Sequence, residues 1–376
     1  MTRGFSLYLD VLRFLAALVV FASHIGYERF TNGNMQWIRD LNLGSDAVVV
    51  FFVLSGFVIA YTTLTKDRGP AAYAEARFAR LYSVVIPALV FTFALDGLGN
   101  WLMPHAYEGW WYNGVDQPGQ FLRALTFTTQ VWTDTTRVGS NGPFWSVAYE
   151  AWYYAGFGVA VFCRGRTRIL VLSLMALLVG PRVLLLAPCW LLGVALQQLV
   201  TRGHAASLSG ATAWLLALAP WALYAGALAL NVPTHLTQMT YQLLGQMVTP
   251  NALFGFSDEF IWNFLIALLI ALHFLGVYSL ARNADWLGAR METAIRWSAG
   301  ATFSLYLFHY PILTFLHGLP VYDSASPLHA ALMAAVALAA CFALAEVSER
   351  RLGAWKRLVH GTFEKLSPKP ASLPQR

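Results

Sequence analysis

Long apolar stretches separated by short polar segments recur along the whole chain. Most are close to the roughly 20 residues that an α-helix needs to cross the hydrocarbon core of a bilayer. The pattern therefore predicts an all-α polytopic membrane protein with about ten transmembrane helices. The predicted spans are 6–27, 46–65, 81–99, 143–163, 168–181, 183–200, 211–230, 260–280, 299–318 and 327–348.

The fifth and sixth predicted spans share one apolar stretch, which Gly180-Pro181-Arg182 interrupts. Proline ends or kinks a helix, so residues 168–200 form either two short spans or one kinked helix. No cleaved signal peptide is expected, because the first apolar run continues past signal length without a small-residue cleavage site. The chain has no internal repeat at the level of residues, which counts slightly against a repeat-built transporter.

Composition agrees with this class, since 57% of the residues are hydrophobic, only 12% are charged and the mean hydropathy is +0.53. Cytoplasmic loops of membrane proteins carry an excess of Lys and Arg. With the N-terminus inside, 19 of the 25 Lys and Arg fall in inner segments and 5 in outer ones. Both termini are therefore predicted to be cytoplasmic. The net charge of +6 follows from this topology, and no nucleic-acid partner is needed to explain it.

We expect one transmembrane domain, residues 1–357, followed by a short basic cytoplasmic tail, residues 358–376. The outward loop 100–142 is rich in Trp, Tyr, Gly and Asn, and it either lies at the lipid interface or covers a pocket. The outward loop 231–259 is polar and ordinary. No metal site is expected, because the cysteines match no zinc or redox spacing and are read as structural: Cys163, Cys189 and Cys341.

The first predicted span contains two ionisable side chains, Arg13 and His24. An ionisable side chain inside a membrane segment is costly and marks a candidate functional site. Their separation is close to three helical turns, so both lie on one face, about 16 Å apart along the axis. Asp10, one turn before Arg13, joins the same stripe. The stripe sets a cation near one side of the bilayer and an acid–base group near the other.

Ser55 and Gly56 fall near the middle of the second predicted span, where small residues let a neighbouring helix or a ligand approach closely. A plain helix contact is the alternative interpretation. Arg77 and Arg80 project from one helical face at the cytoplasmic surface. They could bind phosphate groups, although topology alone also accounts for basic residues there.

Glu150 is predicted to lie about 10 Å below the outer surface, near the depth of His24. A carboxylate beside a histidine would orient the ring and stabilise its protonated form, whereas a purely structural pairing of Glu150 is the alternative. In the ninth span, His309 lies near the middle, with Ser304 further inside and Tyr306 alongside. These residues mark a substrate pathway or hydrogen-bonded packing. Together the positions predict a polar column suited to a long, phosphate-bearing donor.

The same motifs resemble the membrane acyltransferase-3 family over nearly the whole chain. The strongest element is the Asp-x-x-Arg-x10-His pattern, present as Asp10, Arg13 and His24. The other elements follow in the order of the family: FFVLSGF, the Arg77/Arg80 pair, PFWSVAYEAWYY and FSLYLFHYP. Many relatives carry an acidic residue before the FF pair, a proline after the arginine pair and an acidic residue before Glu150. This chain departs from them with Val49 and Val50 (Asp46 lying upstream), Ser83 and Tyr149.

The resemblance implies an acyl-CoA-dependent O-acyltransferase, most simply an acetyltransferase that uses acetyl-CoA. The implied acceptor is a hydroxyl of an extracytoplasmic carbohydrate or glycolipid. His24 would be the general base, supported by Glu150, and a covalent acyl-His24 intermediate stays open. Arg13, Arg77 and Arg80 would bind the phosphates of coenzyme A, with Ser55 and His309 along the donor channel. Supporting positions are expected at Asp10, Trp145, Ser146, Ser304 and Tyr306.

Two other function classes remain open from the residues. A proton-coupled secondary transporter or exporter also needs intramembrane Arg, His and Glu, but it would not consume acyl-CoA. A non-catalytic membrane scaffold gives no reason for a polar column. We expect a multi-pass protein of the bacterial inner (cytoplasmic) membrane in contact with lipids. An oligomer is compatible with the sequence but is not indicated by it.

Overall fold

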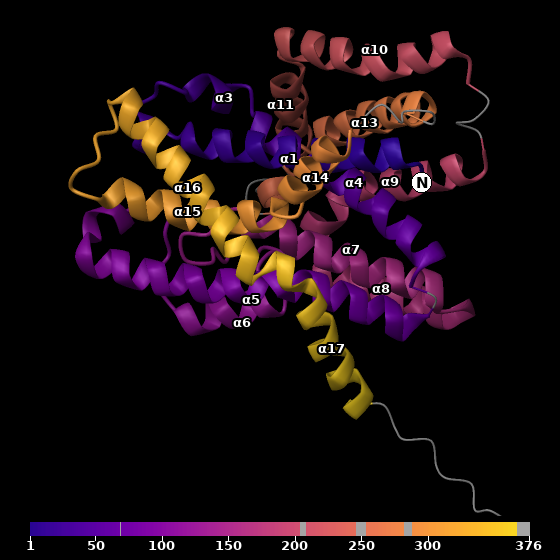
Figure 1. Cartoon of the computed structure of the whole chain (residues 1–376), viewed down its shortest axis with the longest axis horizontal. Helices are drawn as coiled ribbons and strands as arrows, with labels where there is room; N and C mark the ends of the chain where they lie inside the picture. The colour runs from indigo at the N-terminus through magenta and orange to yellow at the C-terminus, as the bar shows by residue number, and fades with distance from the viewer. Residues whose placement is uncertain (68, 204–207, 246–252, 282–287, 367–376) are drawn as a thin grey trace, which may run out of the picture.

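The computed structural model describes residues 1–67, 69–203, 208–245, 253–281 and 288–366 (Figure 1). Within these ranges the regular structure is helical, with a single isolated bridge between Val138 and Asn141. The elements are α1 (Arg3–Ile25), α2 (Glu28–Thr31), α3 (Gln36–Asp40), α4 (Leu43–Thr65), α5 (Pro70–Leu102), η1 (Pro104–Tyr107), α6 (Gln117–Leu125), α7 (Phe144–Phe162), α8 (Gly165–Val179), α9 (Pro181–Thr201), α10 (Gly210–Ala229), α11 (Val232–Leu244), η3 (Gly255–Ser257), α13 (Phe260–Leu280), α14 (Ala289–Ala299), α15 (Thr302–Gly318), α16 (Pro327–Val347), η5 (Glu349–Arg351) and α17 (Leu352–Leu366).

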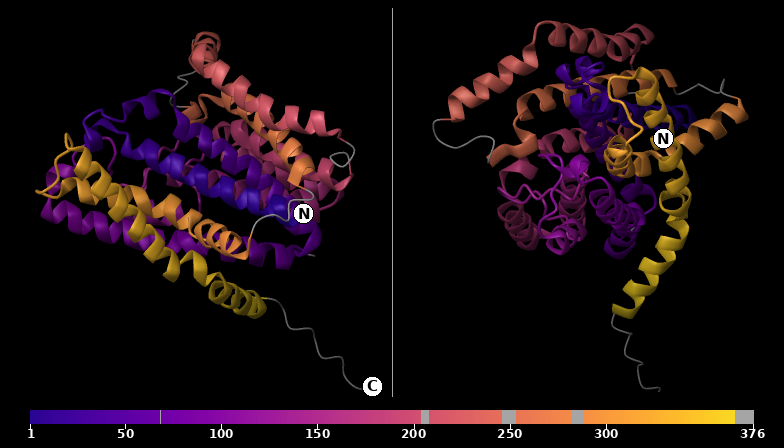
Figure 2. Two further views of the ribbon diagram at one scale, coloured as in Figure 1. Left: turned by 45° about the horizontal axis from the view of Figure 1, so that its top comes forward. Right: turned by 90° about the vertical axis from the view of Figure 1, so that its left-hand side faces the viewer.

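Each predicted span coincides with a helix, so the all-α, polytopic membrane class is confirmed. Among the described residues, 7 helices are long and apolar enough to cross a bilayer. The number rises to 8 if α14 and α15, which meet at a bend of 48°, are counted as one span. The count of ten spans and the cytoplasmic side of the termini stay predictions. The N-terminus and α17 do lie toward the same end of the bundle (Figure 2).

The break in the fifth and sixth predicted spans is a helix boundary. α8 ends at Val179, and α9 begins at Pro181, the first helical position, where a missing N–H costs nothing. Gly180 between them has φ +77°, a conformation that side chains with a Cβ rarely adopt. Residues 168–200 therefore form two separate helices.

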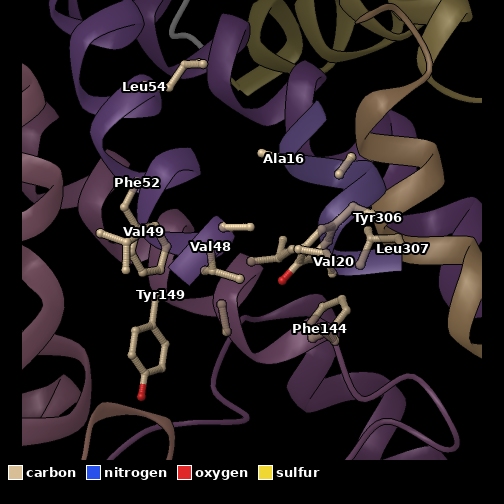
Figure 3. Packing of buried hydrophobic residues seen from close by; sticks show 14 of the residues in the cluster. Ala16, Val20, Val48, Val49, Phe52, Leu54, Phe144, Tyr149, Tyr306 and Leu307 are labelled. Atoms are coloured by element: carbon tan, nitrogen blue, oxygen red, sulfur yellow. The ribbon is translucent and has the colours of Figure 1, made fainter. Parts of the chain in front are cut away.

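The core lies where α1, α4, α7 and α15 meet. Figure 3 shows Ala16 and Val20 of α1 facing Val48 of α4, Phe144 of α7 and Tyr306 of α15. α10 and α11 lie at one edge of the bundle, and α5, α6 and α8 lie toward the other (Figures 1 and 2). This arrangement leaves α1 and α15, which carry both predicted site histidines, in the interior.

α4 and α9 cross at two glycines. A Cβ at Gly56 would lie 2.0 Å from the carbonyl oxygen of Trp190, and a Cβ at Gly193 would lie 2.0 Å from that of Val53. The two backbones are thus in direct contact, as small residues permit in membrane helix pairs. For Gly56 the helix-contact interpretation is correct. Its neighbour Ser55 faces a cavity instead.

Three positions that depart from the family pattern have structural partners. Asp46 accepts hydrogen bonds from the Tyr224 hydroxyl at 2.6 Å and the Trp262 indole at 3.0 Å. Tyr149 shares a hydrogen bond of 3.1 Å with Ser257, and the Ser83 hydroxyl donates to the carbonyl oxygen of Arg80 at 3.0 Å. These residues join helices or helical turns. The expected tail is helical at its start, since α17 runs past residue 358, and residues 367–376 lie outside the described ranges.

Candidate active site

A cavity of about 310 Å³ runs between α1, α4, α5, α7, α15 and α17. Its walls on the α4 side extend from Val48 to Lys66, about 27 Å of helix at 1.5 Å per residue. The cavity is therefore nearly as long as the hydrocarbon core is thick. Seven of the predicted site residues line it: Arg13, Ser55, Arg77, Arg80, Ser146, Glu150 and Tyr306.

Three arginines line this cavity, and each is held by a carboxylate. Arg13 pairs with Asp10 at 3.1 Å and donates to the Ala299 carbonyl at 3.2 Å. Arg77 pairs with Asp67 at 2.7 Å, and Arg80 pairs with Glu349 at 2.8 Å. Among the described residues, the Nε atoms of Arg13 and Arg77 are buried without a hydrogen-bond partner. The ion pairs thus orient the guanidinium groups, and the N–H donors that are not used in these pairs can bind an anion.

Sequence reasoning missed two lysines at this site. Lys66 at the end of α4 and Lys356 on α17 are exposed and line the same cavity. In the sequence they contribute only to the excess of Lys and Arg in the inner segments, because 290 residues of chain separate them. In the folded protein the two lysines lie with Arg77 and Arg80 at one end of the cavity.

A directed chain of hydrogen bonds ends on Glu150. The Trp190 indole donates to the Ser55 hydroxyl oxygen at 3.1 Å. Ser55 lies 3.2 Å from the Tyr154 hydroxyl, which donates to Glu150 Oε1 at 2.6 Å. Because the indole only donates and the carboxylate only accepts, the Ser55 proton points to Tyr154. Ser55 and Glu150 are thus held in fixed positions on the cavity wall by two residues that sequence reasoning did not single out.

His24 and His309 form a dyad beyond the deep end of the cavity. His24 Nδ1 lies 2.8 Å from His309 Nε2, and His309 Nδ1 lies 2.8 Å from the Leu305 carbonyl oxygen. A carbonyl only accepts, so His309 carries its proton on Nδ1 and accepts on Nε2 when both rings are neutral. His24 then donates from Nδ1, which leaves the lone pair on Nε2. The geometry therefore makes His24 Nε2 the basic atom.

The expected contact between Glu150 and His24 is absent among the described side chains. The partner of Glu150 is Tyr154, and the partner of His24 is His309. Tyr306 lies between the two groups: it lines the cavity, shares a 2.6 Å hydrogen bond with Ser146 and stands 6.5 Å, ring centroid to centroid, from His309. The two groups thus do not share a hydrogen bond, because equal depth on two helices does not fix their rotation, and electrostatic support of His24 by Glu150 stays a prediction.

Three other predicted residues do not line the cavity. His309, expected along the donor channel, does not line the cavity and contacts His24 instead. Ser304 binds Glu349 through its backbone N–H at 2.9 Å, which holds the partner of Arg80. Trp145 stacks on Phe256 at 4.6 Å, away from the dyad.

The loop between α5 and α7 reaches the dyad through Tyr27. Trp110 packs against Tyr27 at 5.6 Å, and Tyr27 in turn stacks on His24 at 6.0 Å. Asp96 anchors this loop by accepting from the backbone N–H and hydroxyl of Ser140 at 2.7 and 2.6 Å. In the same loop, burial raises the pKa of Tyr112, so its hydroxyl stays protonated. The loop thus packs toward the dyad through Trp110 and Tyr27, and its contact with the lipid interface stays a prediction.

A proline fastens this loop to α15. Pro311 has no N–H, so the carbonyl of Leu307, four residues earlier, lacks its helical partner. The Asn141 side chain donates to that carbonyl at 2.9 Å and to Thr92 at 3.1 Å. The loop is thereby tied to the turn of α15 that carries His309. No three His, Cys, Asp or Glu side chains in the described ranges are arranged to hold a metal ion.

Comparison with known proteins agrees with this geometry. The family model described as an acyltransferase domain matches residues 6–346. Over 149 residues the chain is 33% identical to Acyltransferase MdmB of Streptomyces mycarofaciens, across 39% of this chain and 36% of that protein. The chain thus spans about a third of the length of this relative. No solved structure matches. Because the family model covers most of the chain, the protein belongs to the acyltransferase-3 family of membrane enzymes that transfer acyl groups.

Proposed function

We propose that this enzyme transfers an acyl group, most simply acetyl, from cytoplasmic acyl-CoA to a hydroxyl of an extracytoplasmic carbohydrate or glycolipid. The observation that carries the proposal is the cationic cavity that ends one ring away from the His24–His309 dyad. In this proposal the protein lies in the bacterial inner membrane with both termini in the cytoplasm. The bias of Lys and Arg toward the inner segments supports that orientation.

The two ends of the cavity match the two ends of acyl-CoA, the charged nucleotide and the thioester. Its phosphates would contact the cationic end, where Arg77, Arg80 and the exposed Lys66 and Lys356 line the wall. Its narrow pantetheine arm would follow α4, and the thioester would reach Tyr306. A cavity of about 310 Å³ holds the arm, while the nucleotide stays at the mouth.

The dyad supplies the base for direct transfer. His24 Nε2 takes the proton of the acceptor hydroxyl as its oxygen attacks the thioester carbonyl, and a tetrahedral intermediate forms. When the carbon–sulfur bond breaks, the thiolate of coenzyme A leaves and takes the proton from His24. The products are the O-acyl ester and free coenzyme A, and His24 is again neutral. Attack by Nε2 itself would instead give an acyl-His24, detectable by mass spectrometry of the quenched enzyme.

Donor binding can be tested without knowing the acceptor. In the Arg77→Gln variant we expect the concentration of acetyl-CoA that half-saturates the protein to rise about tenfold, because a charge-assisted hydrogen bond is worth roughly 1.5–3 kcal/mol. The measurement is the rise in melting temperature of the purified, detergent-solubilised protein with increasing acetyl-CoA.

Arg168→Gln is the matched control, because Arg168 is exposed at the start of α8 and its side chain donates to the Ala160 carbonyl, away from the cavity lining. It should leave the titration unchanged. A wild-type protein that acetyl-CoA does not stabilise at any concentration would contradict the proposed donor.

His309 is proposed as a positioning residue, and a conservative variant separates this role from packing. His309→Ala removes the acceptor of the His24 Nδ1 proton, so we expect kcat to fall about 10- to 100-fold with the KM for acetyl-CoA unchanged. His309→Gln keeps an acceptor oxygen near the same place and should recover part of the rate. The measurement is thiol release with cell-envelope glycans as acceptor. Equal rates in the two variants would argue against the proposed hydrogen bond.

A further inference from the structure

Three arginines surround the outer side of His24, each from a different segment. Arg29 lies on α2, Arg39 on α3 and Arg137 in the loop before α7. Arg29 lies 5.3 Å from the Tyr310 ring, whose centroid is 4.9 Å from that of His24. Arg39 lies 3.7 Å from the Tyr27 ring, which stacks on His24. Both are therefore one aromatic ring away from the dyad.

The Arg29 guanidinium is short of partners. Among the described residues its Nε and Nη1 are buried without a hydrogen-bond acceptor, and Nη2 donates to the Thr314 hydroxyl at 3.4 Å. The Tyr310 hydroxyl is a second, neutral hydrogen-bonding neighbour of the group. These neighbours are neutral, so they leave the charge unbalanced and most of the five N–H donors unused. A buried charge without a counter-ion is costly to the folded protein.

The three arginines that line the cavity differ from these in having carboxylate partners. Arg13, Arg77 and Arg80 each have a carboxylate within 3.1 Å. Within the described ranges, neither Arg29 nor Arg39 nor Arg137 has a carboxylate within 4.0 Å. Excess positive charge is thus concentrated near His24, and the part of the chain that the structure describes places no carboxylate against these three arginines.

Aromatic rings pack against these guanidinium groups. Arg29 lies 4.0 Å from the Phe30 ring and 4.5 Å from that of Trp111, and Arg137 lies 5.2 Å from that of Trp110. Cation–π contacts stabilise the charge but do not accept the in-plane N–H groups. Those groups stay available for a planar or tetrahedral anion. Trp110 is 60% exposed and offers a flat apolar face to a sugar ring.

We propose that the acyl acceptor carries an anionic group, a carboxylate or a phosphate, which Arg29, Arg39 and Arg137 bind while His24 deprotonates the neighbouring hydroxyl. The proposal rests on the proposed function above. Because one aromatic ring separates Arg29 and Arg39 from His24, the anion lies about one sugar residue or less from the acylated hydroxyl. The substrate class is therefore an acidic sugar or a phosphorylated glycan or glycolipid.

The experiment uses the purified full-length enzyme, acetyl-CoA labelled in the acetyl group, and cell-envelope glycans and glycolipids separated by anion exchange into neutral and anionic fractions. We expect label to enter the anionic fraction. Before the reaction, one portion of the anionic fraction has its carboxyl groups reduced to alcohols, and another portion is treated with phosphatase. The first treatment should abolish labelling if the anion is the carboxylate of an acidic sugar, and the second should abolish it if the anion is a phosphate.

Arg29→Gln and Arg137→Gln should lower kcat/KM for the anionic acceptor at least tenfold and leave the half-saturating acetyl-CoA concentration unchanged. Arg123→Gln is the matched outer control, since Arg123 pairs with Asp134 at 3.2 Å, and it should behave as wild type. Label in the neutral fraction alone, undiminished in Arg29→Gln, overturns the anionic acceptor and leaves the proposed function standing. No transfer of label to any fraction overturns both.

Discussion

Replacing His24 with alanine is expected to lower kcat for acyl transfer by about 10²–10⁴-fold, the usual contribution of a general base. The lone pair on Nε2 is the only feature of the dyad that can take the proton of an attacking hydroxyl, because both nitrogens of His309 are engaged. The measurement is thiol release from acetyl-CoA in the presence of the acceptor fraction. Binding of acetyl-CoA should stay close to wild type, since His24 does not line the cavity.

Two controls separate lost chemistry from lost structure. The thermal titration with acetyl-CoA reports whether the His24→Ala protein is folded and holds its donor. His235→Ala replaces an exposed histidine on α11 and should keep full activity. Full activity in the His24→Ala protein would remove His24 from the catalytic site.

Replacing Gly193 with alanine is expected to destabilise the protein by about 3 kcal/mol, the upper part of the range for overpacked interiors. The added Cβ would lie 2.0 Å from the Val53 carbonyl oxygen and 2.8 Å from the Phe57 backbone nitrogen. These atoms are backbone and cannot rotate away, so α4 and α9 must separate. Since Trp190 of α9 donates to Ser55 of α4, the separation also opens the cavity wall.

The measurement is the melting temperature of the purified protein in detergent, together with the yield of monodisperse protein. Gly226→Ala is the matched control, because a Cβ at this helical glycine of α10 meets no atom within 4 Å. It should be neutral or slightly stabilising, since alanine is the better helix former. A Gly193→Ala protein as stable as the control would contradict the crossing at these glycines.

Much of the helical architecture was predictable because it depends on local patterns. A span is an apolar run of sufficient length, and its ends follow from polar residues, glycine and proline. Gly180-Pro181 is such a case, and the helix boundary falls there. Arg13 and His24 could be recognised on their own, because an ionisable group in an apolar run stands out without knowledge of its partners.

The partners of these residues were less predictable. Depth along a helix follows from counting residues, whereas rotation about the helix axis depends on how whole helices pack. Similar depth therefore did not reveal that Glu150 and His24 have different hydrogen-bond partners, and the contact between His24 and His309, 285 residues apart, was not anticipated. Arg29, Arg39 and Arg137 carried no signal as charges in polar segments, because only the folded structure shows that none of them pairs with a carboxylate among the described residues.

The sequence by itself determined the membrane class, the helices, the family resemblance and the residues able to hold a proton or a phosphate. Hydropathy and motif spacing are properties of the chain, and no folding is needed to read them. Only the tertiary structure decided that His309 directs the His24 proton, that Arg13, Arg77, Arg80 and two lysines line one cavity, and that the buried Arg29 guanidinium has no carboxylate partner among the described residues. Hydrogen-bond direction and charge balance are set by atoms a few ångströms apart in space, and helix packing brings those atoms together from distant parts of the chain.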